Sequence, residues 1–169
     1  MSDTSKTTLV LGHAASGKSV WAERVARRAG GPVTYVATAR VGDDEMAAKV
    51  ARHAARRDAD WTLVEAPADL ATPCAAATGI VLIDCMTMWL TNTMMDDAPW
   101  EPSLTRMVEA MTTAQARFLV VSNDVGGGIT PDNALARRFQ REQGALNQRL
   151  AAACDRVVLV TAGLGQVLK

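Results

Sequence analysis

The sequence predicts an α/β fold whose mostly parallel sheet is covered by helices on both faces. Apolar runs and helical segments alternate along all 169 residues. The apolar runs are short and nearly continuous, as in strands buried on both faces. The first run leads straight into a glycine-rich turn and a helix, the arrangement of a phosphate-binding site. The length and the 49% hydrophobic content suit one domain over residues 1–169 with a single core.

A phosphate-binding loop follows the first predicted strand, residues 7–11. The loop matches the pattern G-x-x-x-x-G-K-[ST] at every fixed position, and it comprises Gly12, His13, Ala14, Ala15, Ser16, Gly17, Lys18 and Ser19. In such a loop the backbone N–H groups point inward, Lys18 reaches the β- and γ-phosphates, and the Ser19 hydroxyl can ligate Mg²⁺. The sequence therefore predicts a nucleotide site, with Lys18 acting on the phosphates.

The composition favours a small-molecule partner. Eighteen basic and eighteen acidic residues cancel, and the pI is near 6.7, so nothing indicates binding to nucleic acid or to an anionic membrane. Cys74, Cys85 and Cys154 are odd in number and lack metal-ligand spacing. The amino terminus shows no apolar signal segment, and no apolar run approaches the roughly 18 residues of a membrane span. We expect a reduced, cytoplasmic protein.

The second predicted strand brings a candidate ligand contact. A helix over residues 18–29 stops at Gly30-Gly31-Pro32, and a strand over 33–37 follows. The end of this strand, Ala37-Thr38-Ala39, lies at the carboxyl edge of the sheet, where parallel α/β sheets bind ligands. Thr38 is therefore a secondary candidate.

An acidic first turn at Asp43–Glu45 predicts a helix that continues to Arg57 and carries His53. At 100° per residue, Met46, Lys49, Val50, His53, Arg56 and Arg57 share one face. Two interpretations remain open from this spacing. In one, His53 is a boundary residue beside solvated arginines. In the other, the cations gather phosphate oxygens around a neutral, nucleophilic imidazole.

A carboxylate ends the next buried strand. Residues 61–65 form an extended segment ending in Glu65, and Pro67 begins a predicted helix near 68–77. Four branched apolar residues, 80–83, then lead into Asp84, the pattern of a buried parallel strand that delivers an acid beside a phosphate loop. Asp84 is the candidate for the Mg²⁺ side of the site.

The second half of the chain continues the alternation. Predicted helices cover residues 85–95, a segment capped by Ser103 after a loop at 96–102, and 133–153; predicted strands cover 118–121 and 157–160, with an edge strand in the tail 163–169. Leu104, Met107, Val108 and Met111 fall at core spacing and are not a cofactor site. The long helix is expected to bury Leu135, Phe139, Leu146 and Leu150, with Arg137, Arg138, Arg141 and Arg149 outward. The segment 122–133 with three glycines is a loop, mobile or closely approached.

These motifs, in this order, resemble the bifunctional adenosylcobinamide kinase/adenosylcobinamide-phosphate guanylyltransferase family of cobalamin biosynthesis. The similar segments are 16–19, 35–38, 43–47 leading to His53, Trp61-Thr62 with Glu65, 125–131, 133–139, and Gly144 with Asn147-Gln148. The resemblance covers nearly the entire chain. It implies a P-loop NTPase-like (RecA-like) three-layer fold.

The resemblance also implies the chemistry. Adenosylcobinamide, a corrinoid, is phosphorylated by ATP or GTP; GTP then guanylylates a histidine at the position of His53, and GMP passes to adenosylcobinamide phosphate. The implied nucleotide contacts are the phosphate loop, Ala37, Thr38, Ala39, Ala54, Ala55, Arg56, Arg57, Glu65 and Asp84. Mg²⁺ is the implied cofactor, and the implied assembly is a homotrimer with sites between subunits.

Three positions depart from the family pattern. The family usually has basic residues where Ala15 and Ala54 stand, and a Glu where Asp124 stands. Each departure removes or shortens a group expected near phosphate. His13, the other histidine of the chain, lies inside the phosphate loop and is interpreted as a variable position.

Two alternatives come from other functional classes. A nucleotide-switch GTPase would hydrolyse slowly and form no covalent intermediate, but the chain has no Asn-Lys-x-Asp motif for guanine. A small-molecule kinase without the transferase step would leave His53 merely structural.

Overall fold

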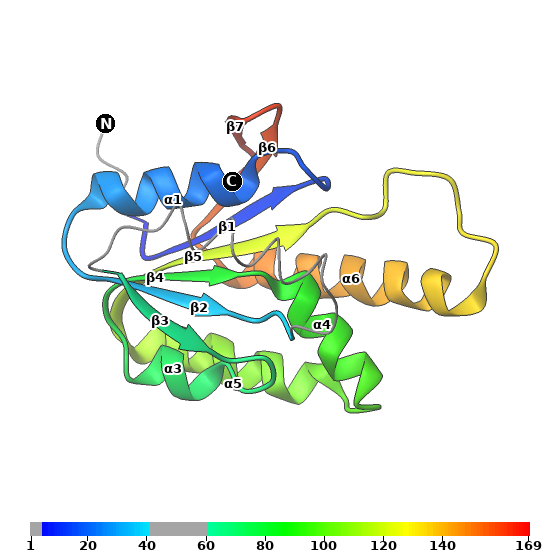
Figure 1. Cartoon of the computed structure of the whole chain (residues 1–169), viewed down its shortest axis with the longest axis horizontal. Helices are drawn as coiled ribbons and strands as arrows, with labels where there is room; N and C mark the ends of the chain where they lie inside the picture. The colour runs from blue at the N-terminus through cyan, green and yellow to red at the C-terminus, as the bar shows by residue number, and fades with distance from the viewer. Residues whose placement is uncertain (1–4, 41–60) are drawn as a thin grey trace.

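The computed structural model describes residues 5–40 and 61–169. Its sheet has seven strands in the order β3-β2-β4-β5-β1-β6-β7 (Figure 1). The strands are β1 (Thr7–Gly12), β2 (Val33–Ala37), β3 (Thr62–Glu65), β4 (Thr78–Asp84), β5 (Gln115–Asn123), β6 (Arg156–Thr161) and β7 (Leu164–Val167). Neighbouring strands are parallel except for the antiparallel pair of β6 and β7. The predicted mostly parallel sheet is confirmed.

Helices cover both faces of this sheet, which gives three layers. The described helices are α1 (Lys18–Ala29), α3 (Ala71–Ala75), α4 (Met86–Met95), α5 (Trp100–Thr113) and α6 (Ala134–Ala153). Figure 1 shows α1 on one side of the sheet and the other four on the opposite side. Two buried clusters match this division. One cluster packs Ala22 and Ala26 of α1 against one face of the sheet, and the other packs α3, α4, α5 and α6 against the opposite face. None of the helices among the described residues is long and apolar enough to cross a bilayer.

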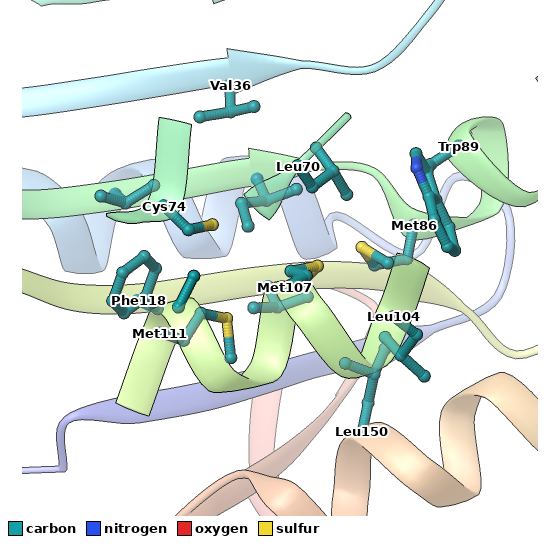
Figure 2. Packing of buried hydrophobic residues seen from close by; sticks show 14 of the residues in the cluster. Val36, Leu70, Cys74, Met86, Trp89, Leu104, Met107, Met111, Phe118 and Leu150 are labelled. Carbon is teal, nitrogen blue, oxygen red and sulfur yellow. The ribbon is translucent and has the colours of Figure 1, made fainter. Parts of the chain in front are cut away.

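The larger core cluster uses the methionines of α5 as packing residues. Met107 and Met111 point toward Phe118 of β5 and toward α3, as Figure 2 shows. Both methionines are at most 1% exposed, so the prediction that they belong to the core is confirmed. Cys74 and Cys154 are also buried, and this burial raises the pKa of their thiols to about 12 and about 11. Neither thiol is therefore reactive near neutral pH.

The helix expected near residues 68–77 is wrong in its start. α3 begins at Ala71, with the Asp69 carboxylate accepting a hydrogen bond from the Ala71 N–H at 3.0 Å. The Pro67 and Ala68 carbonyls instead accept hydrogen bonds from α4, namely from Asn92 Nδ2 at 2.9 Å and from Trp89 Nε1 at 2.7 Å. These tertiary contacts hold the segment in a non-helical path.

The cap expected at Ser103 is also wrong, because α5 begins at Trp100 and contains Ser103. Pro102 lies at the third helical position, where the backbone N–H has no intrahelical acceptor, so proline costs nothing there. The earlier start buries Trp100, whose indole N–H donates to Glu142 Oε2 at 2.9 Å.

The long helix α6 differs from expectation at its first turn. Asn133 is the N-cap, and its side chain accepts a hydrogen bond from the Ala136 N–H at 2.7 Å. Leu146 and Leu150 are fully buried as expected, but Leu135 is 69% exposed. The first turn of α6 extends beyond the sheet (Figure 1), so Leu135 has no core to enter.

Candidate functional site

The phosphate loop lies between β1 and α1, as the sequence predicts. Lys18 is the first residue of α1, and the turn before it needs two left-handed residues, Ala15 at φ 59° and Gly17 at φ 89°. The Ser16 N–H donates to the His13 carbonyl at 3.2 Å. These dihedrals curl the backbone into the concave turn that cradles an anion at a helix N-terminus.

The glycines of the loop are required by close approach. A Cβ at Gly12 would lie 2.4 Å from Ser16 Oγ and 2.6 Å from the Val160 carbonyl oxygen. A Cβ at Gly17 would lie 3.1 Å from the Gly163 Cα. Any side chain at Gly12 would therefore push the loop away from the sheet.

Both strands that flank β1 hold the loop from outside. The Asp124 N–H, just past β5, donates to the Gly12 carbonyl at 3.0 Å, and the Gly163 N–H, just past β6, donates to the Ser16 carbonyl at 2.8 Å. His13 Nδ1 donates to the Asp124 carbonyl at 2.9 Å, because a carbonyl only accepts. The loop is thus fixed at three points to the carboxyl edge of the sheet.

Lys18 is held within the loop that it serves. Its ammonium group donates to the His13 carbonyl at 3.1 Å, and the residue is 9% exposed. The loop itself therefore holds this cation, through the His13 carbonyl, before any phosphate arrives.

Other candidate residues lie in one row at the carboxyl ends of the parallel strands. Ala37 pairs with both Glu65 and Asp84, and Gly12 pairs with Asn123. Tyr35 donates its hydroxyl to Asp84 Oδ2 at 3.0 Å. In the row, β5 stands between Asp84 and the phosphate loop. Asp84 is thus on the same edge as the loop but one strand removed from it.

The Thr38 side chain has a structural role. It is fully buried, its hydroxyl donates to the Cys85 carbonyl at 2.7 Å, and it accepts from the Cys85 N–H at 2.8 Å. Asn92 Nδ2 donates to the Thr38 carbonyl at 2.8 Å. These bonds fix the turn after β2 against the turn after β4, so Thr38 holds the backbone of Ala37 and Ala39 at the carboxyl edge of the sheet.

An ion pair continues this attachment where β2 ends. Arg40 donates to both carboxylate oxygens of Asp96, at 2.7 and 2.6 Å. The hydrogen bond from Arg40 lowers the pKa of the Asp96 carboxyl. The pair is exposed to solvent and contributes little to stability, but it fixes the direction in which the chain leaves β2.

Sequence reasoning missed a buried polar network behind β5. Ser122 donates to Asn147 Oδ1 at 2.6 Å, and Gln143 Nε2 donates to Ser122 Oγ at 2.9 Å and to Asn147 Oδ1 at 3.0 Å. Asn147 Nδ2 donates to the Asn123 carbonyl at 2.9 Å. Gln140, Gln143 and Asn147 recur on α6 at helical spacing, a signal in the sequence that could have indicated this network.

Several predicted residues lie outside the described part of the chain. They are His53, Ala54, Ala55, Arg56 and Arg57, so the structure neither joins them to the phosphate loop nor separates them from it. Within residues 5–40 and 61–169, no three His, Cys, Asp or Glu side chains form a preformed metal cluster.

The sheet order and the phosphate loop together define a P-loop NTPase-like fold. Solved structures agree at the level of fold. The RadB recombinase matches with a TM-score of 0.54 at 17% identity over 90% of this chain and 73% of that chain. An ATPase of a bacterial type III secretion system matches with a TM-score of 0.58 at 8% identity, over 96% of this chain and 56% of that chain. The predicted P-loop NTPase-like fold is confirmed.

Sequence comparison identifies the family. Residues 8–168 match the family described as cobinamide kinase / cobinamide phosphate guanyltransferase. The bifunctional adenosylcobalamin biosynthesis protein CobP of Pseudomonas aeruginosa is 42% identical over 95% of this chain and 96% of its own length. CobU of Salmonella typhimurium is 36% identical over 95% of this chain and 98% of its own length. The chain belongs to this family of transferases, which confirms the resemblance.

The fit of the loop against the sheet predicts different GTP affinities for two glycine-to-alanine variants. Gly12→Ala should lower GTP affinity roughly 10-fold or more, because its Cβ displaces the N–H groups that would bind phosphate. Gly144→Ala is the matched control, since among the described residues nothing beyond the adjacent backbone of α6 lies within 4 Å of its Cβ position. It should stabilise the protein by about 0.5–1 kcal/mol and leave affinity unchanged. Titration with a fluorescent GTP analogue and thermal melting measure both; equal affinities for the two variants would contradict the steric argument.

Proposed function

We propose that one domain spanning residues 1–169 performs both reactions of its family. It phosphorylates adenosylcobinamide with ATP or GTP, and it then transfers GMP from GTP, through a guanylylated His53, to adenosylcobinamide phosphate. The product is adenosylcobinamide-GDP. The observation that carries this proposal is a complete phosphate loop, with Lys18 in place, in a chain that matches the family over residues 8–168.

The kinase step takes place at the γ-phosphate, the terminal phosphate of the nucleotide. The aminopropanol hydroxyl of adenosylcobinamide attacks the γ-phosphorus, its proton is lost, and the bond from the γ-phosphorus to the β-γ bridging oxygen breaks to release the nucleoside diphosphate. Positioning and charge neutralisation supply most of the rate in such transfers. The loop backbone and Lys18 are suited to both tasks.

The transferase step takes place at the α-phosphate, the phosphate next to the nucleoside. An imidazole nitrogen of His53 attacks the α-phosphorus of GTP, and pyrophosphate leaves. A phosphate oxygen of adenosylcobinamide phosphate then attacks the same phosphorus, the P–N bond breaks, and His53 is restored. A loop that holds the β- and γ-phosphates leaves the α-phosphorus accessible and already neutralises the leaving pyrophosphate.

Oxygen atoms at the site suit Mg²⁺, the expected cofactor. We assign its protein contacts to the Ser19 hydroxyl and the Asp84 carboxylate, because hard cations prefer oxygen ligands. When bound, the ion would offset the charge of the triphosphate. Tyr35 holds the Asp84 carboxylate in place through its hydroxyl.

The remaining nucleotide contacts are proposed from the family resemblance and the geometry of the edge. Ala37, Thr38 and Ala39 would contact the nucleotide through their backbone, because the Thr38 hydroxyl is engaged by Cys85. Glu65 joins them in register with Ala37. The segment Ala54–Arg57 is proposed on the family pattern. Three free cysteines favour a reducing compartment, the cytoplasm.

The covalent intermediate is the sharpest test of this function. GTP labelled at the α-phosphate, with Mg²⁺, should label the protein through an acid-labile, base-stable bond. His53→Ala should abolish the label while kinase activity partly survives, because phosphorylation of the hydroxyl needs no imidazole nucleophile. Label retained in the His53 variant would refute the assignment. Kinase activity without any label in the unmodified protein would favour the kinase alternative, and GTP hydrolysis alone would favour the switch.

A shared triphosphate site predicts coupled losses. Lys18→Ala and Asp84→Ala should each lower both activities, roughly 100-fold for Lys18, since both reactions draw on one bound nucleotide. Lys6→Ala is the control, because the Lys6 ammonium group only donates to the Thr112 carbonyl on the surface. Separate steady-state assays of phosphorylation and GMP transfer would measure this. Lys18→Ala with normal GMP transfer would show that the two steps use different sites.

We also propose a cyclic homotrimer. A domain of 18.0 kDa must hold a triphosphate and a much larger corrinoid, and large pockets form preferentially at subunit boundaries. The Gly126–Gly128 loop, which extends from the carboxyl end of the sheet (Figure 1), or the segment carrying His53 would face the neighbouring subunit. Light scattering at micromolar concentration should return about three times the chain mass. A fully active monomer would exclude the trimer.

A further inference from the structure

Asn123 is the last residue of β5 and lies beside the start of the phosphate loop. It pairs in register with Gly12. Val121, two residues earlier, packs in the cluster that contains Ala22 and Ala26 of α1. Because strand side chains alternate between faces, the Asn123 side chain is on the α1 face, the face of the phosphate loop. Asp84 is on this face too, since Leu82 belongs to the same cluster.

The backbone of Asn123 is fixed from two helices. Its N–H donates to Thr87 Oγ1 of α4 at 2.8 Å, and its carbonyl accepts from Asn147 Nδ2 of α6 at 2.9 Å. Asn147 is itself held by Ser122 and Gln143, which is fully buried. On the side of β5 that faces β4, where strand pairing ends at Val121, side chains thus replace the sheet ladder and hold the backbone from which the Asn123 carboxamide projects.

The carboxamide oxygen of Asn123 is buried and has no hydrogen-bond partner within the described residues. Buried oxygens are almost always paired, because leaving one unpaired forfeits its interaction with water. The Ser16 hydroxyl, at the base of the loop, is also buried and unpartnered there, so the two do not bond to each other. A donor that arrives with a bound ligand would satisfy the Asn123 oxygen.

The spacing of the strands indicates which donor this is. Neighbouring strands lie about 4.8 Å apart, so the backbones of β1 and β4 are separated by roughly 10 Å with β5 between them. Two ligands of one Mg²⁺ lie at most about 4.2 Å apart, and the ion usually keeps several of its waters. In the proposed metal site, waters of an ion held by Ser19 and Asp84 would fill the space between β1 and β4, where Asn123 ends β5.

We propose that Asn123 is an outer-sphere ligand of the metal ion at the nucleotide site. Its carboxamide oxygen accepts a hydrogen bond from a water bound to the divalent cation of the metal–triphosphate complex, between the phosphate loop and Asp84. This inference rests on the proposed function for the presence of that complex. Asn147 and Thr87 position the carboxamide through the backbone of Asn123.

The test compares nucleotide affinity with and without metal, so it does not depend on turnover. A fluorescent GTP analogue is titrated into the full chain in Mg²⁺ and in EDTA, and the ratio of the two dissociation constants is the metal-dependent gain. Asn123→Ala should reduce that gain about 10-fold while the affinity in EDTA stays unchanged, since loss of an outer-sphere partner typically weakens metal binding by this amount. Asn123→Asp keeps an acceptor oxygen and should retain the gain.

A control variant on α6 accompanies this test. Asn133→Ala removes an asparagine with a capping bond at the far end of α6, so it should leave the gain unchanged even if it lowers the melting temperature. An unchanged gain in folded Asn123→Ala, an equal loss with and without Mg²⁺, or failure of Asn123→Asp to retain the gain would each overturn the proposal. If Asn123→Ala does not fold, loss of the gain in Asn123→Asp still overturns the proposal. If the unmodified protein shows no gain, the proposed function fails instead.

Discussion

Two backbone hydrogen bonds hold the phosphate loop in shape, and the remainder of the site depends on them. They run from the Asp124 and Gly163 N–H groups to carbonyls of Gly12 and Ser16. A loop that binds phosphate must turn its own N–H groups inward, so its carbonyls point outward and need donors. Here the strands on either side of β1 supply both donors. The central position of β1 is therefore a requirement of the binding loop, and Gly17 carries no side chain because a Cβ there would lie 3.1 Å from the Gly163 Cα.

A second constraint acts at the end of β5, where the regular ladder stops but the chain must still stay in place. Side chains on one face of α6 take over the role of the missing strand partner. Arg137 donates to the carbonyls of Pro131 and Asp132, and Gln140 donates to the Val125 carbonyl. Gln143 donates to the Ser122 hydroxyl, while Asn147 donates to the Asn123 carbonyl and accepts from the Ser122 hydroxyl. Such a polar stripe costs buried apolar area on the helix. Its benefit is a defined exit from β5 beside the phosphate loop, and Arg137 is half-buried for this reason rather than fully outward.

The sequence predicted those parts of the fold that local patterns determine. Branched apolar runs placed β1, β2 and β4 closely, and glycines ended α1 at Ala29. The failures at Pro67, Ser103 and Leu135 share one cause, because tertiary contacts or their absence decide those positions: α4 binds the Pro67 carbonyl, Trp100 bonds to Glu142, and Leu135 lies beyond the sheet. In the site, the linear loop motif was readable. The insertion of β5 between Asp84 and the loop was not, since strand order is a non-local property.

The geometry of the loop bears on how one site could serve two reactions. In the proposed function the two attacking groups, a hydroxyl and the His53 imidazole, reach different phosphorus atoms of a nucleotide that is held in one way. Lys18 is fixed on the loop itself through the His13 carbonyl, so the charge that neutralises the β- and γ-phosphates does not depend on which group attacks. Selectivity between the reactions must then come from the parts of the site outside the loop. Among the described residues these are the ends of β2, β4 and β5, where Thr38, Tyr35 and Asn147 hold the backbone or carboxylate in place. A rigid phosphate loop, with the ends of β2, β4 and β5 held by separate contacts, suits an enzyme with two acceptors. The groups that recognise the acceptor can then differ between the two reactions while the triphosphate stays bound in one way.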